Sequence, residues 1–269
     1  MSSIHVNNVK LYYQSVGNGT ETIVFSHGYL MDNTMFNGQI DALKNKFKCI
    51  SYDQRGHGKS EVTKEGYALD NLVKDAISLI EELNLGSVHF VGMSTGGFVG
   101  MRIALQRPDL LKSLVLMDTS AEDEDEKSLK QYNQLLWMIK NIGWFAVISK
   151  VFPLLFHSSF IQNDSKKEEK KKWKNIITGH SKKGVIPFGK GIFSRNSVLE
   201  KFSNITIPTA IMVGEFDVAT PPDYAKRMAS KIPDASFYTI PDAGHSAAVE
   251  KPVDVANAIQ DFYSKNGFI

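Results

Sequence analysis

The sequence has one cysteine, little net charge and no long apolar run, and each of these features excludes a class of protein. Cys49 has no second cysteine to pair with, which rules out an internal disulfide and an all-cysteine metal site. A formal charge of +2 over 269 residues gives no reason to expect nucleic acid or an acidic membrane surface as partner. No apolar run is long enough to span a bilayer, and no secretory signal is visible. We therefore expect a cytoplasmic protein without a membrane partner.

Short β-rich runs alternate with helical periodicity along most of the chain. The runs 22–26, 47–52 and 113–117 are typical of buried strands, and 69–85 is typical of an amphipathic helix. This alternation favours a largely parallel sheet covered by helices on both faces, with ligands beyond the carboxyl ends of the strands. From 121 to 204 the pattern becomes helical throughout. The sequence thus predicts an α/β core formed by 1–120 and 205–269, with 121–204 as a helical insertion.

The central motif is Gly92-Met93-Ser94-Thr95-Gly96, a G-x-S-x-G element between a strand-like run and a helix-like run. A sharp strand-to-helix turn at this point lifts the Ser94 hydroxyl out of the sheet, and it needs small residues where the backbone segments approach. The alternative is a glycine-rich turn with a solvated serine. We interpret Ser94 as a catalytic nucleophile.

A serine nucleophile needs a base, and the base needs an acid that fixes its tautomer. His245 follows the penultimate predicted element in a glycine-containing turn and is the candidate base. Asp217 follows a strand and a glycine, and the order Ser, Asp, His is the one expected for this architecture. Glu215 and Asp118 are alternatives for the acid. His57 lies in a glycine-rich loop, where a structural role in the turn is favoured.

The developing oxyanion requires preorganised donors. One is expected to be the backbone N–H of Thr95, the residue after the nucleophile. The second is expected from the loop after the strand 22–26, where Gly28 permits a tight turn and Tyr29 offers its N–H. His27 and Gly28 are expected to border the substrate pocket.

The insertion 121–204 is rich in aromatic residues. Trp137, Trp144 and Phe145 are candidates for contact with an apolar part of a substrate, although aromatic side chains at helical spacing also serve as the core of a helical unit. Both interpretations remain open from the sequence.

Several short motifs together resemble the α/β-hydrolase superfamily, over almost the whole chain except 121–204. They are Ser26-His27-Gly28-Tyr29, Tyr52-Asp53-Gln54-Arg55-Gly56-His57-Gly58-Lys59-Ser60, Gly92–Gly97, Gly214–Pro221 and Asp242-Ala243-Gly244-His245. Within the superfamily the chain is most similar to the group of 3-oxoadipate enol-lactonases, carboxylesterases and cofactor-free haloperoxidases or perhydrolases. The resemblance implies an eight-stranded sheet with an antiparallel second strand, a helical cap at 121–204 after the sixth strand, and no metal or organic cofactor.

The motifs predict a serine hydrolase that cleaves a carboxylic ester or lactone of a small, partly apolar molecule. Alternatives with the same residues are hydrolytic C–C cleavage of a diketone, and peracid formation with haloperoxidase activity. Serine rather than aspartate at the turn argues against dehalogenase and epoxide hydrolase chemistry. A ligand receptor without turnover is the alternative from a different class.

Overall fold

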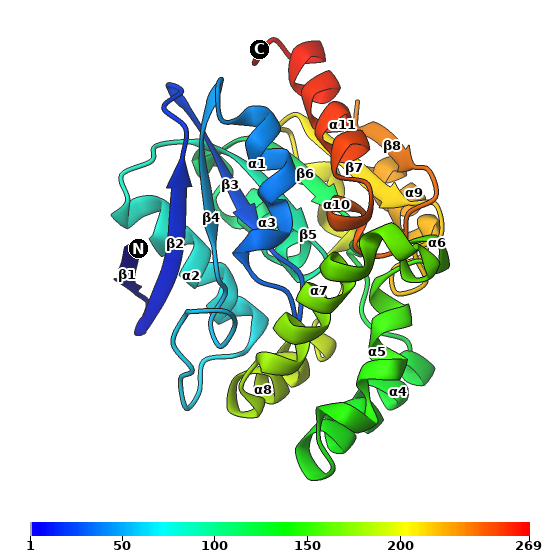
Figure 1. Cartoon of the computed structure of the whole chain (residues 1–269). Coiled ribbons are helices and arrows are strands. Elements are labelled where there is room, and N and C mark those ends of the chain that lie inside the picture. Colours follow the sequence, from blue (N-terminus) through cyan, green and yellow to red (C-terminus); the bar gives the residue numbers. More distant parts are fainter. Residues whose placement is uncertain (1) are drawn as a thin grey trace.

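An eight-stranded sheet runs through residues 2–269, the part of the chain that this computed structural model describes (Figure 1). The strands are β1 (Ser2–Val6), β2 (Val9–Val16), β3 (Glu21–Ser26), β4 (Phe47–Tyr52), β5 (Val88–Met93), β6 (Leu111–Met117), β7 (Thr209–Gly214) and β8 (Ser236–Ile240). Their order across the sheet is β1-β2-β4-β3-β5-β6-β7-β8. β2 is antiparallel to both neighbours, and every other pair is parallel. The expected mostly parallel sheet with an antiparallel second strand is confirmed.

The central strands are apolar on both sides because helices cover both faces of the sheet. All six residues of β5 and of β7 are buried. Successive side chains of a strand point to opposite faces, so Phe90 packs into one hydrophobic cluster and Val91 into the other. β8 alternates between half-exposed and exposed positions, as expected of an edge strand with one face toward solvent.

Two groups of helices cover the sheet. α2 (Leu69–Glu82), α3 (Thr95–Gln106) and α9 (Pro222–Lys231) contribute to the cluster that contains Phe90. α1 (Asn37–Leu43), α10 (Ala247–Glu250) and α11 (Pro252–Lys265) contribute to the cluster that contains Val91. Because β3, β5, β7 and β8 run parallel, the loops that leave their carboxyl ends meet along one edge of the sheet.

Between β6 and β7 the structure has helices instead of a further βα unit. They are α4 (Glu126–Asn141), α5 (Ile148–Leu155), α6 (Ser158–Gln162), α7 (Lys167–Gly179) and α8 (Lys182–Phe193). We call residues 121–204 the cap segment; α4 and α8 pack together and lie beyond the carboxyl edge of the sheet (Figure 1). Helices thus follow the sixth strand in the structure, and the division of the chain into a core and a cap stays a prediction. None of the helices within 2–269 combines the length and apolarity that crossing a bilayer requires.

Candidate active site

Ser94 lies at the turn between β5 and α3 in a strained backbone conformation. Its backbone φ and ψ are 51° and −113°, a combination that residues other than glycine rarely adopt. A Cβ atom on Gly96 would collide with the backbone carbonyl of Ser26, and one on Gly92 would collide with the carbonyl of Gly96. The close packing of β3, β5 and α3 thus requires the two glycines of the motif. The turn directs Ser94 into a cavity above the sheet.

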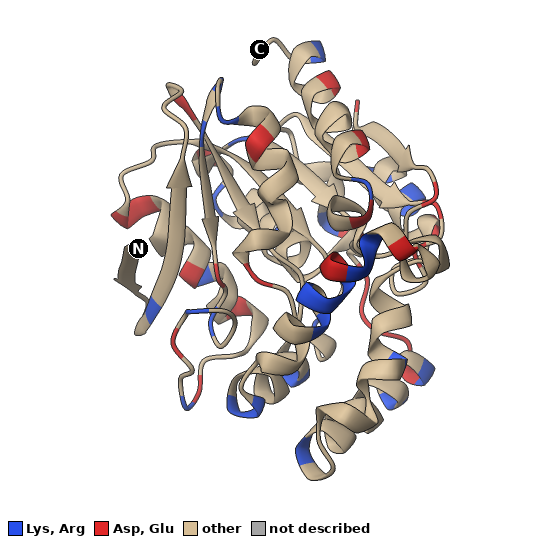
Figure 2. Ribbon diagram, in the orientation of Figure 1, with Lys and Arg blue, Asp and Glu red and all other residues tan. Residues whose placement is uncertain are grey.

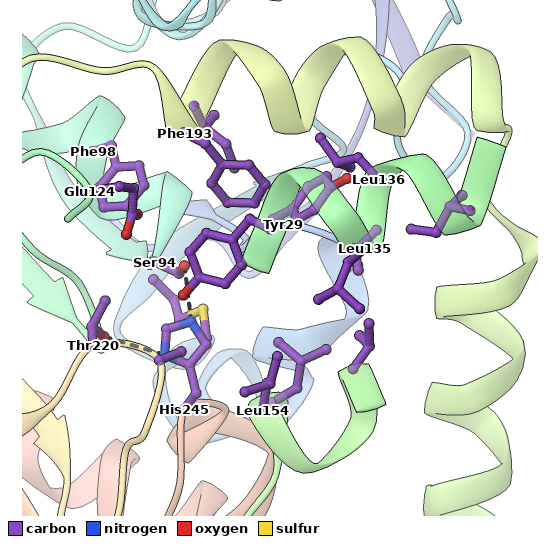
Figure 3. A pocket seen from close by; sticks show the side chains of 18 residues that line it. Tyr29, Ser94, Phe98, Glu124, Leu135, Leu136, Leu154, Phe193, Thr220 and His245 are labelled. Atoms are coloured by element: carbon purple, nitrogen blue, oxygen red, sulfur yellow. Dashed lines mark hydrogen bonds between the residues drawn. The ribbon is translucent and has the colours of Figure 1, made fainter. Parts of the chain in front are cut away.

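Three side chains from distant loops form a hydrogen-bonded chain at this edge. Ser94 Oγ is 3.0 Å from His245 Nε2, and His245 Nδ1 is 2.9 Å from Asp217 Oδ2 (Figure 3 draws the serine–histidine bond). His245 lies between β8 and α10, and Asp217 follows β7. All three residues are buried. The parallel strand order explains the meeting, because β5, β7 and β8 end at the same edge.

The loop around Asp217 holds its carboxylate in place before any substrate arrives. The backbone N–H groups of Ala219 and Thr220 each donate to Asp217 Oδ1 at 2.9 Å, and Thr220 Oγ1 donates to Oδ2 at 2.8 Å. A carboxylate only accepts hydrogen bonds, so His245 carries its proton on Nδ1 and leaves Nε2 to accept from the Ser94 hydroxyl. This is the tautomer that a base for Ser94 needs.

The two alternative acids lie elsewhere. Asp118, at the end of β6, accepts from the backbone N–H of Gly214 at 2.7 Å and from that of Ala247 at 3.3 Å. Burial, followed by the nearby charge of Asp217, raises the pKa of the Asp118 carboxyl well above its ordinary value. Glu215 accepts from the backbone N–H of Asp242 on the surface. Of the three candidates, Asp217 is the one that the structure brings to the imidazole.

The two expected oxyanion donors, the N–H groups of Tyr29 and Thr95, belong to segments that adjoin Ser94. The loop after β3 packs directly on the nucleophile, since a Cβ atom on Gly28 would lie 3.2 Å from Ser94 Cβ. Thr95 begins α3, where the first N–H groups of a helix have no partner within the helix. Within residues 2–269 the N–H groups of Tyr29 and Thr95 donate to no protein acceptor. Their role as oxyanion donors stays a prediction.

Three buried histidines support the loop that carries Tyr29. His57 Nε2 accepts from the backbone N–H of Leu30 at 3.2 Å, and His180 Nε2 donates to the Leu30 carbonyl at 3.0 Å. His27 Nε2 accepts from the N–H of Gln54 at 2.9 Å. Burial lowers the pKa of all three imidazoles, His57 most clearly. The sequence indicated a structural role for His57 and gave no role to His180, which connects the cap segment to this loop.

The cavity above Ser94 is mostly apolar. In Figure 3, Ser94 and His245 lie on one side of it and Leu135, Leu136 and Leu154 of the cap segment on the other. Its lining residues are Tyr29, Leu30, Met93, Ser94, Phe98, Glu124, Tyr132, Leu135, Leu136, Ile139, Val151, Leu154, Leu155, Ile192, Phe193, Ala219, Thr220 and His245. The cap segment thus supplies most of the wall.

The structure corrects four of the five expected pocket residues. Trp137 and Phe145 are 59% and 78% exposed on the outer side of the cap segment, and Trp144 packs against the hydrophobic core instead of lining the cavity. Residues 136 and 137 differ by about 100° around α4, so the helix turns Leu136 inward and Trp137 outward. His27 is fully buried beneath the loop. Gly28 lies beside Ser94 and stays a candidate.

Two charged residues at the site were not singled out from the sequence. Glu124 lines the cavity and accepts from Arg195, whose guanidinium lies 3.9 Å from the centre of the Phe98 ring. Glu250 accepts from the backbone N–H groups on both sides of His245, at 3.1 and 3.3 Å, and from that of His157 in the cap segment at 2.9 Å. Glu124 lies in a run of acidic residues and Glu250 at the end of α10, and no sequence motif around either residue indicates a role at the site.

Among residues 2–269, no three His, Cys, Asp or Glu side chains are grouped so as to hold a metal ion. The groups that the structure brings together at this point are the hydroxyl of Ser94, the imidazole of His245 and the carboxylate of Asp217.

Comparisons with known proteins agree with this geometry. A family described as "alpha/beta hydrolase fold" matches residues 21–252. The chain is 27% identical to 3-oxoadipate enol-lactonase 1 of Acinetobacter baylyi, over 87% of this chain and 86% of that one. It is 24% identical to a putative non-heme bromoperoxidase of Mycobacterium tuberculosis, over 95% and 98%. A thermophilic esterase from Thermogutta terrifontis superposes with a TM-score of 0.91 at 26% identity, over 98% and 99%. The chain belongs to the α/β-hydrolase family.

Proposed function

We propose that the protein is a serine hydrolase that cleaves a carboxylic ester or lactone through an acyl-enzyme. The single observation that carries this proposal is the chain Ser94–His245–Asp217, with Oγ–Nε2 and Nδ1–Oδ2 distances of 3.0 and 2.9 Å, at the base of an apolar cavity. The similarity to an enol-lactonase and an esterase agrees with it.

In the first half of the reaction, Ser94 Oγ attacks the carbonyl carbon while His245 Nε2 takes the hydroxyl proton. Asp217 stabilises the imidazolium that forms. The N–H groups of Tyr29 and Thr95 donate to the oxyanion. His245 then gives the proton to the leaving alkoxide, and an acyl-enzyme remains on Ser94.

In the second half, His245 activates a water molecule that attacks the acyl carbon, and the acid leaves as Ser94 Oγ regains a proton. In a lactone the leaving alkoxide stays joined to the acyl group, and ring opening gives a hydroxy acid.

The cavity favours a short apolar acyl or alcohol group. Its volume is about 100 Å³, which is less than the roughly 150 Å³ of an engineered apolar cavity that holds benzene. Aliphatic and aromatic side chains surround most of it, and the Glu124–Arg195 pair supplies charge at the wall. We therefore expect acetyl to butyryl esters to react faster than octanoyl esters.

The experiment is a panel of p-nitrophenyl esters and simple lactones, combined with a fluorophosphonate probe. Turnover with a burst of p-nitrophenol, and probe labelling that Ser94→Ala abolishes, support the proposal. Turnover that Ser94→Ala retains would overturn the mechanism. Binding of a substrate without any product over long incubation would favour a receptor instead.

A second candidate activity is peracid formation, which the similarity to a bromoperoxidase favours. Hydrogen peroxide in place of water attacks the acyl carbon, the bond to Ser94 Oγ breaks, and a peroxy acid leaves with no change in the oxidation state of the protein. Oxidation of bromide in acetate buffer with peroxide, lost in Ser94→Ala, is the test. Peroxide-independent ester turnover alone would assign the protein to hydrolysis.

A further inference from the structure

The small net charge of the chain hides an uneven distribution. The cap segment holds 15 Lys and Arg against nine Asp and Glu, a net charge of +6, and the remainder holds 16 against 20, a net charge of −4. Figure 2 shows Lys and Arg positions on α7 and at the free ends of α4 and α8. The positive charge therefore gathers on the cap segment, away from the sheet.

The outer side of the cap segment combines this charge with exposed aromatic rings. Trp137 is 59% and Phe145 78% exposed. Exposed apolar side chains that gather in one patch, unlike isolated ones, often mark an interaction surface. We call this surface the basic aromatic face; it consists of Trp137, Lys140, Phe145, Lys182, Lys183 and Lys190.

These residues form one continuous surface. Trp137 and all four lysines line a single groove between α4 and α8. Phe145 joins it at Gly143, where a Cβ atom would lie 3.5 Å from the Phe145 ring and 3.9 Å from Lys182 Nζ. The exposed Ile142 extends the apolar part. The face thus presents rings surrounded by ammonium groups.

The lysines of the face are uncompensated. No carboxylate lines the groove. Within residues 2–269, seven lysines elsewhere on the surface pair with Asp or Glu, and none of these four does. Their charge is available to an anionic partner.

We propose that the basic aromatic face binds the surface of an anionic lipid bilayer. Indole and phenyl rings are favoured at the boundary between headgroups and acyl chains, and lysines just outside that boundary attract acidic headgroups. The aliphatic Ile142 and Ile186 beside the rings favour hydrocarbon over a phosphodiester backbone, and the face contains no arginine for bidentate phosphate contacts. This amends the expectation from the sequence, where the total charge suggested no membrane partner.

Docking in this way places the cavity close to the bilayer. Leu136 lines both the groove and the cavity above Ser94, so one side chain separates the lipid-facing surface from the reaction site. The proposal itself concerns binding and does not require activity.

The test is flotation of the full chain with vesicles of phosphatidylcholine alone and with 25% phosphatidylglycerol, in 0.1 M salt. We expect binding to the anionic vesicles to be at least tenfold tighter. Lys182→Gln with Lys183→Gln should weaken it about 25-fold, since each basic residue near an anionic surface contributes about fivefold. Trp137→Ala should weaken it about tenfold, and the blue shift of tryptophan emission on vesicle addition should disappear in Trp137→Phe.

Matched controls lie on α11, outside the cap segment (Figure 1). Val253→Ala removes an apolar group that is 67% exposed, and Lys265→Gln removes an exposed charge. Both should bind like the unmodified protein, and all variants should hydrolyse a soluble short ester at the same rate. Equal binding to neutral vesicles, or equal losses in the control variants, would overturn the proposal. So would binding to heparin without vesicles, or a concentration-dependent dimer that Trp137→Ala abolishes.

Discussion

The loops at the carboxyl edge of the sheet and the cap segment form opposite walls of one cavity by different physical means. On the sheet side, directional bonds fix the reacting atoms: two backbone N–H groups and a hydroxyl hold Asp217, and a strained turn holds Ser94. On the cap side, the wall consists mostly of apolar side chains, such as Leu135 and Ile139, that are held by packing.

We therefore expect the two walls to control different properties of the site: reaction rate on the sheet side and substrate selectivity on the cap side. Directional bonds position a reacting group to within a fraction of an ångström, and their loss reduces rate. Packing sets the shape of a space, and a change in it alters which molecules fit. Substitutions on the sheet side should therefore reduce kcat, whereas substitutions in the cap segment should change selectivity.

The largest effect is expected for Ser94→Ala on the sheet side. Removal of the nucleophile should lower kcat for p-nitrophenyl butyrate by about 10³- to 10⁶-fold. Steady-state kinetics measure the loss, and circular dichroism checks that the variant is folded.

Ser246→Ala is the matched control for this change. Ser246 is equally buried and adjoins His245, but its hydroxyl has no partner within residues 2–269. Its kcat should stay within about threefold of the unmodified protein, because no bond is lost. Comparable losses in both variants would show that the effect comes from disturbance of the loop and would remove the nucleophile from the mechanism.

The next largest effect is expected for Asp217→Asn. An amide at this position favours the wrong imidazole tautomer, so kcat should fall by about 10²- to 10⁴-fold with little change in KM. Asp118→Asn should instead lower the free energy of unfolding by about 1–3 kcal/mol, since Asp118 accepts two backbone N–H bonds, and leave kcat within about tenfold. Kinetics and urea denaturation of both variants provide the measurement. The reverse pattern would assign the acid to Asp118.

The same contrast explains how far the sequence could predict the structure. The turn at Ser94 and the loop before His245 depend on glycines and on strand ends a few residues away, so short motifs indicate them. Asp217 could be preferred over Asp118 by its turn after a strand and a glycine, but only the three-dimensional arrangement shows that Asp118 is directed to backbone N–H groups.

The cap segment was predicted as helical, and its inward-facing residues were not. An aromatic side chain in the sequence suggests a buried position. Which side of α4 faces the cavity depends on how α4 packs against α8, and the local sequence does not encode that packing. Leu136 therefore lines the cavity, whereas Trp137, the next residue in the sequence, does not. His180 and Glu250 act through backbone atoms of distant residues, and such contacts leave no trace in a single sequence.

On the cap side, Leu136→Ala should change selectivity more than rate. The smaller side chain enlarges the cavity, so the ratio of kcat/KM for octanoyl over butyryl esters should rise by about tenfold. The variant should also lose about 2–4 kcal/mol of unfolding free energy. Trp137→Ala, at the next position, should leave this ratio unchanged with soluble esters. An unchanged chain-length profile in Leu136→Ala would mean that the acyl group lies elsewhere.

The smallest effect concerns Glu250, which joins the two walls by accepting from backbone N–H groups beside His245 and at His157. Burial raises its pKa to about 7, above the value of about 4.3 in an unfolded chain. The unfolded chain thus loses this proton first as pH rises. The contribution of Glu250 to the free energy of unfolding is therefore complete below about pH 4 and falls up to pH 7, by at most about 4 kcal/mol.

Glu250→Gln removes this titration and turns an amide N–H toward the N–H of His157. The variant should be less stable than the unmodified protein by about 1–3 kcal/mol at pH 5, and the difference should shrink at pH 8. Urea denaturation at the two pH values measures it, with the exposed Glu200→Gln as control. Parallel curves would mean that Glu250 is ionised in the folded protein at both pH values. A second outcome is that the stability difference shrinks while kcat of the variant is also lower. That result would show that the hydrogen bond of Glu250 to the cap segment helps to position His245.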